Sequence, residues 1–168
     1  MTPEERARTI AYLDLAEGRG PVPLVSDAGI ADLLGTARRI AVIGASDDPR
    51  RPSHDVFQHL LSVGFDCVPV NPNVATVANV PAFPTLADAV AATGPVDIVD
   101  VFRQPSFCPA HAREAVAAGA RCLWLQLGIV DWEAAKIARD GGLAVVMDRC
   151  LSVEWRRHGR VRGTTEGA

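Results

Sequence analysis

Residues 40–54 read Ile40-Ala41-Val42-Ile43-Gly44-Ala45-Ser46-Asp47-Asp48-Pro49-Arg50-Arg51-Pro52-Ser53-His54. The four apolar residues at the start are typical of a parallel strand that is covered on both faces. Gly44 and Ala45 then allow a sharp turn, and Ser53 is placed to cap a helix that begins near His54. Backbone amides and the positive end of a helix at such a turn favour a phosphate group, so a phosphorylated ligand is the first hypothesis. The same strand, turn and helix also occur as plain scaffold.

The composition limits the class of protein. A chain of 168 residues with 48% hydrophobic residues can build one respectable core, so we expect one main domain. A net charge of -3 gives no global basic field, which argues against nucleic acid or a membrane surface as the main partner. The N-terminus has no apolar signal core, and no apolar run approaches the ~20 residues that cross a bilayer. We therefore expect a cytoplasmic protein.

Strand-sized and helix-sized segments alternate from Ile40 onward. This alternation predicts an α/β fold, namely a Rossmann-like, doubly wound parallel sheet of five strands with right-handed crossovers. The predicted strands lie at 39–43, 66–70, 97–101, 121–125 and 143–147, and the predicted helices between them at 54–63, 86–93, 107–118 and 132–140.

The first residues form a separate region in this prediction. Thr2, Pro3 and Glu5 have the pattern of a capped helix start, and that helix should end near Glu17. A second, short helix should follow Asp27. The predicted organisation is an N-terminal helical extension over residues 1–35, a ligand-binding domain over residues 36–160 and a flexible tail over residues 161–168.

Ligands of open α/β sheets bind beyond the carboxyl ends of the strands, where the strand order reverses. The candidate site therefore consists of the residues that follow each strand. These segments are Gly44 to Arg51, Asn71 to Asn73, Phe102 to Pro105, Gln126 to Gly128, and Asp148 to Cys150.

Two common phosphate-binding motifs are missing from the first turn. A dinucleotide site needs three spaced glycines there and an acidic residue that closes the second strand. The turn has only Gly44 before Asp47, and the second strand is followed by Asn71. A Walker-type loop needs a lysine and a hydroxyl residue after its last glycine, and neither follows Gly44.

Five motifs together resemble a known family. They read Ile40-Ala41-Val42-Ile43-Gly44-Ala45-Ser46, Val68-Pro69-Val70-Asn71-Pro72, Val96-Asp97-Ile98-Val99-Asp100-Val101-Phe102-Arg103, Leu123-Trp124-Leu125-Gln126-Leu127-Gly128 and Val145-Val146-Met147-Asp148-Arg149-Cys150. In this order and spacing, residues 36–158 resemble the small bacterial CoA-binding proteins, whose domain is similar to the CoA-binding part of the succinyl-CoA synthetase alpha subunit.

The resemblance implies coenzyme A as the ligand and assigns positions to it. Gly44, Ala45, Ser46 and Asp47 would meet a phosphate, and Asn71 with Pro72 would flank the adenosine. The nucleotide or the pantetheine would be lined by Phe102, Arg103 and Pro105, and the pantetheine path would be bordered by Gln126 and Gly128. The synthetase subunit carries a phosphorylated histidine in a second domain that this chain lacks, so the resemblance does not imply acyl-CoA ligation.

Charge adds one physical condition to this assignment. Asp47 and its neighbour Asp48 repel a phosphate. Arg50, Arg51 or Arg103 must therefore supply the compensating charge, because an arginine fork suits phosphate oxygens.

Other reactive-looking residues have plainer interpretations. Cys150 follows a strand beside Arg149 and is a candidate thiolate, although cysteines are commonly buried. His54 is interpreted as a solvent-facing residue of a first helical turn, and Asp100 as a buried acceptor for a neighbouring loop. Trp124 should fill core rather than stack on adenine. No metal site is predicted, because the four cysteines and four histidines lack ligand spacing.

The sequence thus predicts a protein that binds CoA or an acyl-CoA and has no catalytic machinery of its own. Two other classes of function stay open. One is an NAD(P)-binding protein or a redox sensor or enzyme that uses Cys150. The other is a scaffold that acts only through protein partners.

Overall fold

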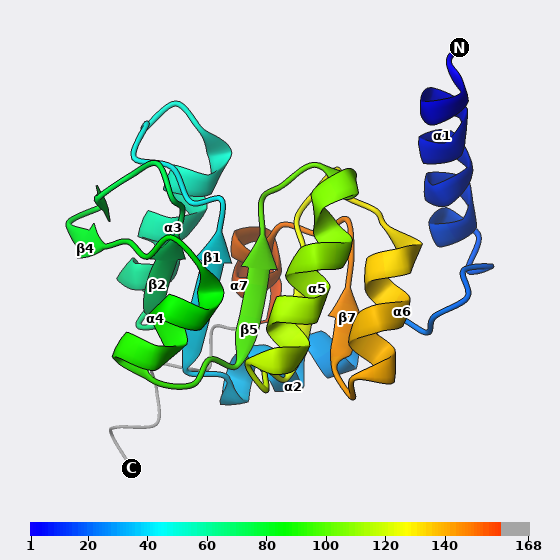
Figure 1. The fold of residues 1–168 in the computed structure, drawn as a ribbon. Helices are drawn as coiled ribbons and strands as arrows, with labels where there is room; N and C mark the ends of the chain where they lie inside the picture. The colour runs from blue at the N-terminus through cyan, green and yellow to red at the C-terminus, as the bar shows by residue number, and fades with distance from the viewer. Residues whose placement is uncertain (159–168) are drawn as a thin grey trace.

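The computed structural model describes residues 1–158. Its centre is a parallel sheet in the strand order β2-β1-β5-β6-β7, which confirms the predicted Rossmann-like α/β fold (Figure 1). The strands are β1 (Arg39–Ile43), β2 (Asp66–Val70), β5 (Ile98–Val101), β6 (Cys122–Leu125) and β7 (Ala144–Val146).

The strand predictions are confirmed to within one residue at each end. The chain runs from β1 outward to β2 and then returns to the other side of β1 to form β5. The strand order therefore reverses between β1 and β5, which is the position where open α/β sheets bind ligands. Register places Val42 opposite both Pro69 of β2 and Asp100 of β5.

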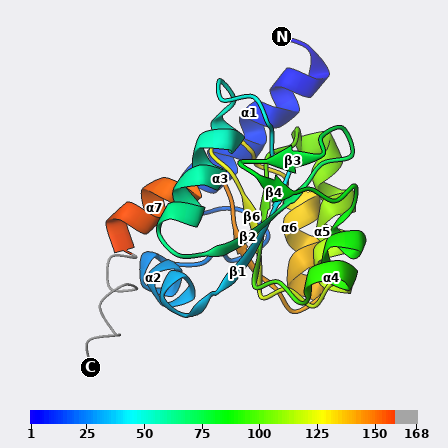
Figure 2. The ribbon, with the colours of Figure 1, turned by 90° about the vertical axis from the view of Figure 1, so that its left-hand side faces the viewer.

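Helices cover both faces of the sheet (Figure 2). Alternate strand residues supply two apolar clusters, with Val99 in the cluster under α4, α5 and α6, and Val42 and Trp124 in the cluster under α2, α3 and α7. The bounds of these helices are α2 (Asp27–Thr36), α3 (Pro52–Ser62), α4 (Leu86–Thr93), α5 (Cys108–Ala117), α6 (Trp132–Asp140) and α7 (Leu151–His158).

Four short elements were not predicted. The helical turn η1 (Pro105–Phe107) precedes α5, so the predicted helix at 107–118 begins one residue later than expected. A small antiparallel pair, β3 (Thr76–Val77) and β4 (Val80–Pro81), has too few residues to show a period of two. α7 was also not predicted, and its last three residues are basic.

The N-terminal helix α1 (Pro3–Ala16) stands beside α6 at the margin of the molecule (Figure 1). The expected capping box is confirmed, since Glu5 N donates to Thr2 Oγ1 and Thr2 N donates to Glu5 Oε2. α1 has no buried residue, and Trp132 Nε1 of α6 donates to the carbonyl of Ala11 at 3.2 Å. By contrast, α2 buries Ile30 and two leucines in the core.

The predicted tail at residues 161–168 lies outside the described residues. Within residues 1–158, none of the helices combines the length and the apolar character that a bilayer crossing requires.

Candidate functional site

Three hollows lie along the carboxyl-terminal edge of the sheet, and Phe102 borders all of them. The turn hollow, of about 460 Å³, is lined by Gly44, Ser46, Asp47, Asp48, Arg51, Pro52, Ser53, Asn71 and Phe102. The α5 hollow, of about 450 Å³, is lined by Ile43, Gly44, Val70, Asn71, Pro72, Asn73, Pro84, Thr85, Phe102, Arg103, His111 and Glu114. The apolar hollow, of about 470 Å³, is lined by Pro52, Val56, Phe102, Arg103, Gln104, Pro105, Gln126, Leu127, Gly128, Ile129 and Cys150.

The structure thus brings most of the predicted site residues to one edge. Ala45 and Arg50 are the two that line none of these three hollows. Ala45 is fully buried, and its carbonyl accepts a hydrogen bond of 2.8 Å from Asn71 Nδ2. That bond ties the turn after β1 to the segment after β2, so Ala45 acts through its backbone. Contact of the lining residues with a ligand stays a prediction.

Gly44 is required by two features of the turn. Its φ of +81° lies in the region that favours glycine. A Cβ at this position would also stand 2.6 Å from the carbonyl oxygen of Phe102. The backbone of Gly44 therefore lies close to the neighbouring loop of the protein itself.

The first turn of α3 differs from the prediction. Ser53 does not cap the helix, which begins at Pro52 with Arg51 as its N-cap residue and no side-chain cap. Instead Ser53 is buried, and its Oγ accepts from Ser46 N at 3.1 Å. His54 is also buried rather than solvent-facing, and its Nδ1 lies 2.9 Å from the carbonyl oxygen of Ser46, to which it donates. Both differences arise because the loop folds back onto the helix.

Several amides of this turn are already used within it. Ser46 N donates to Ser53, Asp48 N to Ser46 Oγ, and Arg50 N to Asp48 Oδ1. Arg51 N donates to the carbonyl of Asp48. The attraction of the turn for a phosphate must therefore depend on side-chain charge more than the sequence suggested.

The three candidate arginines have different surroundings. Arg50 forms a two-pronged ion pair with Asp48, and hydrogen bonds from the Arg50 side chain and backbone hold the pKa of the Asp48 carboxyl below its usual value. Arg50 thus neutralises one of the two repulsive carboxylates. Arg51 and Arg103 line hollows, and neither forms an ion pair within residues 1–158. The Arg103 guanidinium instead stacks over Phe107 at 4.3 Å.

The apolar hollow is backed by a buried polar chain. Gln126 Nε2 donates to Asp100 Oδ2 at 3.2 Å, and Leu151 N donates to Gln126 Oε1 at 3.3 Å. Asp100 is fully buried in the sheet, and this burial raises the pKa of its carboxyl to about 8. Asp100 is the buried acceptor that the sequence predicted. Its carboxyl is therefore mainly protonated at neutral pH and holds the Gln126 side chain beneath the hollow.

Sequence reasoning missed two polar residues of the α5 hollow. His111 Nδ1 lies 3.4 Å from Glu114 Oε2, three residues further along α5. Both are half-buried. They lie within a helix rather than after a strand, so the rule that located the rest of the site did not include them. A polar pair at spacing i, i+3 is the only signal that the sequence offers.

The cysteines are free thiols, and three of the four are buried. Burial raises the pKa of the Cys108 thiol to about 12, and it also raises the pKa values of Cys67 and Cys122. Cys150 is half-buried and lines the apolar hollow. Of the thiols, Cys150 alone borders one of the three hollows. The predicted core role of Trp124 is confirmed by its complete burial.

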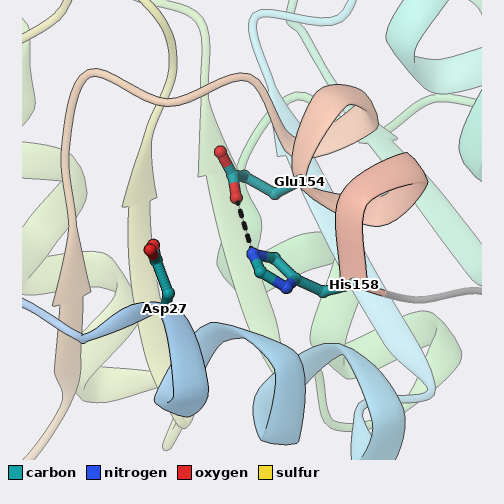
Figure 3. Close-up of side chains that lie close together, drawn as sticks. All are labelled: Asp27, Glu154 and His158. Atoms are coloured by element: carbon teal, nitrogen blue, oxygen red, sulfur yellow. Dashed lines mark ion pairs between the residues drawn. The ribbon is translucent and has the colours of Figure 1, made fainter.

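A polar cluster lies away from this edge, where α2 meets α7. In Figure 3, Glu154 and His158 point toward one another across from Asp27. His158 Nε2 lies 3.4 Å from Glu154 Oε2. Arg149 Nη1 lies 3.0 Å from Asp27 Oδ1 and 3.4 Å from Glu154 Oε1. Arg149 bridges the two carboxylates, and Arg157 Nη1 also lies 3.6 Å from Glu154 Oε1, so we interpret the group as an ion-pair cluster that holds α7 on α2.

The sequence matches the profile of a family described as CoA binding domain over residues 38–156. The chain belongs to this family. Uncharacterized protein YneT of Bacillus subtilis (strain 168) is 38% identical to this chain over 128 residues, which are 76% of this chain and 93% of YneT. The similarity thus extends over nearly the whole length of YneT.

Two solved structures support the same relationship. Cell-free ID.343 from Thermus thermophilus is 40% identical with a TM-score of 0.73, and the match covers 79% of this chain and 98% of that one. A hypothetical protein from Pyrococcus horikoshii OT3 is 32% identical with a TM-score of 0.75, covering 79% of this chain and 92% of that one. The family match over residues 38–156 spans β1 and most of α7, the part of the chain that carries the three hollows.

Proposed function

We propose that this protein binds coenzyme A, or an acyl-CoA, across the three hollows. The observation that carries the proposal is that the three hollows adjoin one another at one edge of the sheet. The turn hollow shares Gly44 and Asn71 with the α5 hollow and Pro52 with the apolar hollow, and the α5 hollow shares Arg103 with the apolar hollow. CoA likewise has three connected parts, namely a phosphorylated adenosine, a diphosphate and an apolar pantetheine arm.

Each hollow suits one part of this ligand. Arg51 supplies the turn hollow with a cation for the diphosphate, while Arg50 neutralises Asp48. The α5 hollow, bordered by Asn71 and Pro72, takes the adenosine. The mostly apolar lining around Gln126 takes the pantetheine arm, with the Gln126 side chain available to an amide of that arm.

A nicotinamide dinucleotide fits these residues less well. A carboxylate at the end of the second strand would hold the ribose hydroxyls of NAD. Here that position is Asn71, and its side-chain amide already donates to the Ala45 carbonyl. The family membership described above also favours CoA.

Thermal unfolding with added ligands tests the proposal. CoA should raise Tm more than NAD or NADP at equal concentration, since ligand at ~100 times its Kd adds about 2.7 kcal/mol to the free energy of unfolding. Mass spectrometry of small molecules released from the purified protein identifies the natural ligand independently. Stabilisation by NAD that equals or exceeds stabilisation by CoA would reject the proposal.

A further inference from the structure

The α5 hollow has charged side chains of its own, which do not line the turn hollow. Among the residues described, its ionisable lining side chains are Arg103, His111 and Glu114. Arg103 has no carboxylate partner within residues 1–158, and Phe107 beneath its guanidinium restrains it by stacking. The hollow therefore presents a cation whose position is set by an aromatic ring rather than by an acid.

His111 is oriented by its neighbour on the helix. Glu114 Oε2 accepts from His111 Nδ1 at 3.4 Å, which places a proton on Nδ1. Nε2 is then the ring nitrogen left for a ligand. Glu114 lines the same hollow, and its Oε2 is engaged by the imidazole through Nδ1.

We propose that Arg103 and His111 form a seat for a terminal phosphate monoester in the α5 hollow, and that this seat selects CoA over 3′-dephospho-CoA. The inference rests on the proposed function. CoA carries two separate anionic groups, the diphosphate and the 3′-phosphate of the ribose. Arg51 lines the turn hollow, Arg103 lines both the α5 hollow and the apolar hollow, and neither arginine forms an ion pair within residues 1–158.

Geometry supports this pairing of groups with hollows. The two hollows share Gly44, Asn71 and Phe102, so a ribose bonded to the diphosphate at one end reaches the second hollow directly. A monoester phosphate has three oxygens available and accepts from a guanidinium fork and from the Nε2–H of a doubly protonated imidazole at the same time. Arg103 and His111 thus become specificity residues for the nucleotide end of the ligand.

Calorimetric titration of CoA and 3′-dephospho-CoA into the full chain tests the inference. Wild type should bind CoA at least about tenfold more tightly, because charged hydrogen bonds to phosphate are strong. His111→Gln should reduce this ratio severalfold while the Kd of 3′-dephospho-CoA changes by less than about twofold. Arg113→Gln is the matched control: Arg113 lies on the same helix, exposed and paired with Glu133, and the variant should keep the wild-type ratio.

The outcomes separate the two proposals. Binding of neither ligand rejects the proposed function. Equal binding of both ligands by wild type leaves the proposed function standing and overturns the phosphate seat. An equal loss of affinity for both ligands in His111→Gln also overturns it. If that variant does not fold, as judged by circular dichroism, Arg103→Gln, at a half-buried position of the seat, replaces it with the same expected ratio. Tighter binding of NADP, whose extra phosphate is on the ribose 2′-oxygen, would overturn the assignment to CoA.

Discussion

The carbonyl oxygen of Phe102 lies 2.6 Å from the point where a Cβ on Gly44 would stand. The backbone joins the same two segments one residue earlier, where Phe102 N donates to the carbonyl of Ile43 at 2.9 Å. The turn after β1 and the loop after β5 are thus in direct contact at the position where the strand order reverses. Since all three hollows meet at Phe102, the shape of the whole candidate site depends on this contact.

The substitution Gly44→Ala, compared with the control substitution Gly142→Ala, tests the importance of this contact. Gly142 has a similar φ, +86° against +81°, but nothing lies within 4 Å of its would-be Cβ. Both substitutions incur the backbone cost of about 1–2 kcal/mol for a left-handed conformation. Gly44→Ala should lose about 1–3 kcal/mol more, because backbone must move to relieve the overlap. Urea unfolding measures the difference, and equal losses in the two variants would show that the Phe102 contact is unimportant.

The different surroundings of Arg50 and Arg51 predict different effects on CoA affinity. Arg51→Gln should weaken binding about tenfold, since it removes the unpaired cation of the turn hollow. The double variant Asp48→Asn with Arg50→Gln removes an ion pair whose charges cancel and should stay within about threefold of wild type. Calorimetric titration gives both values. A larger loss in the double variant than in Arg51→Gln would assign the phosphate to Arg50 instead.

The raised pKa of Asp100 predicts how stability depends on pH. In the folded protein the pKa of this carboxyl is about 8, against an ordinary value of 3.8. Between these values the folded state holds a proton that the unfolded state has lost, so the free energy of unfolding falls as pH rises, by up to about 1.4 kcal/mol per pH unit. Below pH 3.8 both states are protonated and this dependence disappears.

Asp100→Asn removes the titrating group and retains an acceptor for Gln126. This variant should lose the decline in stability between pH 5 and pH 8 and should be more stable than wild type at pH 8. Asp140→Asn, at a solvent-exposed ion pair, should keep the wild-type decline. Chemical unfolding at several pH values gives the slopes. Parallel curves for wild type and Asp100→Asn would show that Asp100 is ionised when folded.

Cys150→Ser distinguishes a reversible binding protein from a thiol-based one. Arg149, the chain neighbour of Cys150, forms ion pairs with Asp27 and Glu154, so its guanidinium is committed to these carboxylates. We expect the serine variant to bind CoA within about threefold of wild type. We also expect no stoichiometric mixed disulfide when diamide is added to take the two thiol hydrogens of Cys150 and CoA. A mass increase that a reductant reverses, and that Cys150→Ser lacks, would favour the redox alternative.

Local pattern was enough for the elements and for much of the edge they form. Short apolar runs such as Ile40 to Ile43 have few other ways to bury their side chains than as central strands, so five strands were placed to within a residue. The rule that ligands bind beyond strand ends then selected Gly44, Asn71 and Phe102. Elements of two residues, such as β3, carry no periodic signal and were missed.

The sequence by itself determined the alternation of strands and helices, the parallel sheet and the segments that meet at its carboxyl edge, because hydrophobic period and turn residues are local properties of the chain. Only the tertiary structure decided which polar groups form hydrogen bonds or ion pairs within the fold and which are available to a ligand. Ser53 and His54 bind Ser46 in the loop after β1, and Arg50 forms an ion pair with Asp48. His111, by contrast, lines the α5 hollow from within a helix. Partners of this kind are fixed by distances across the fold, and a linear sequence does not contain those distances.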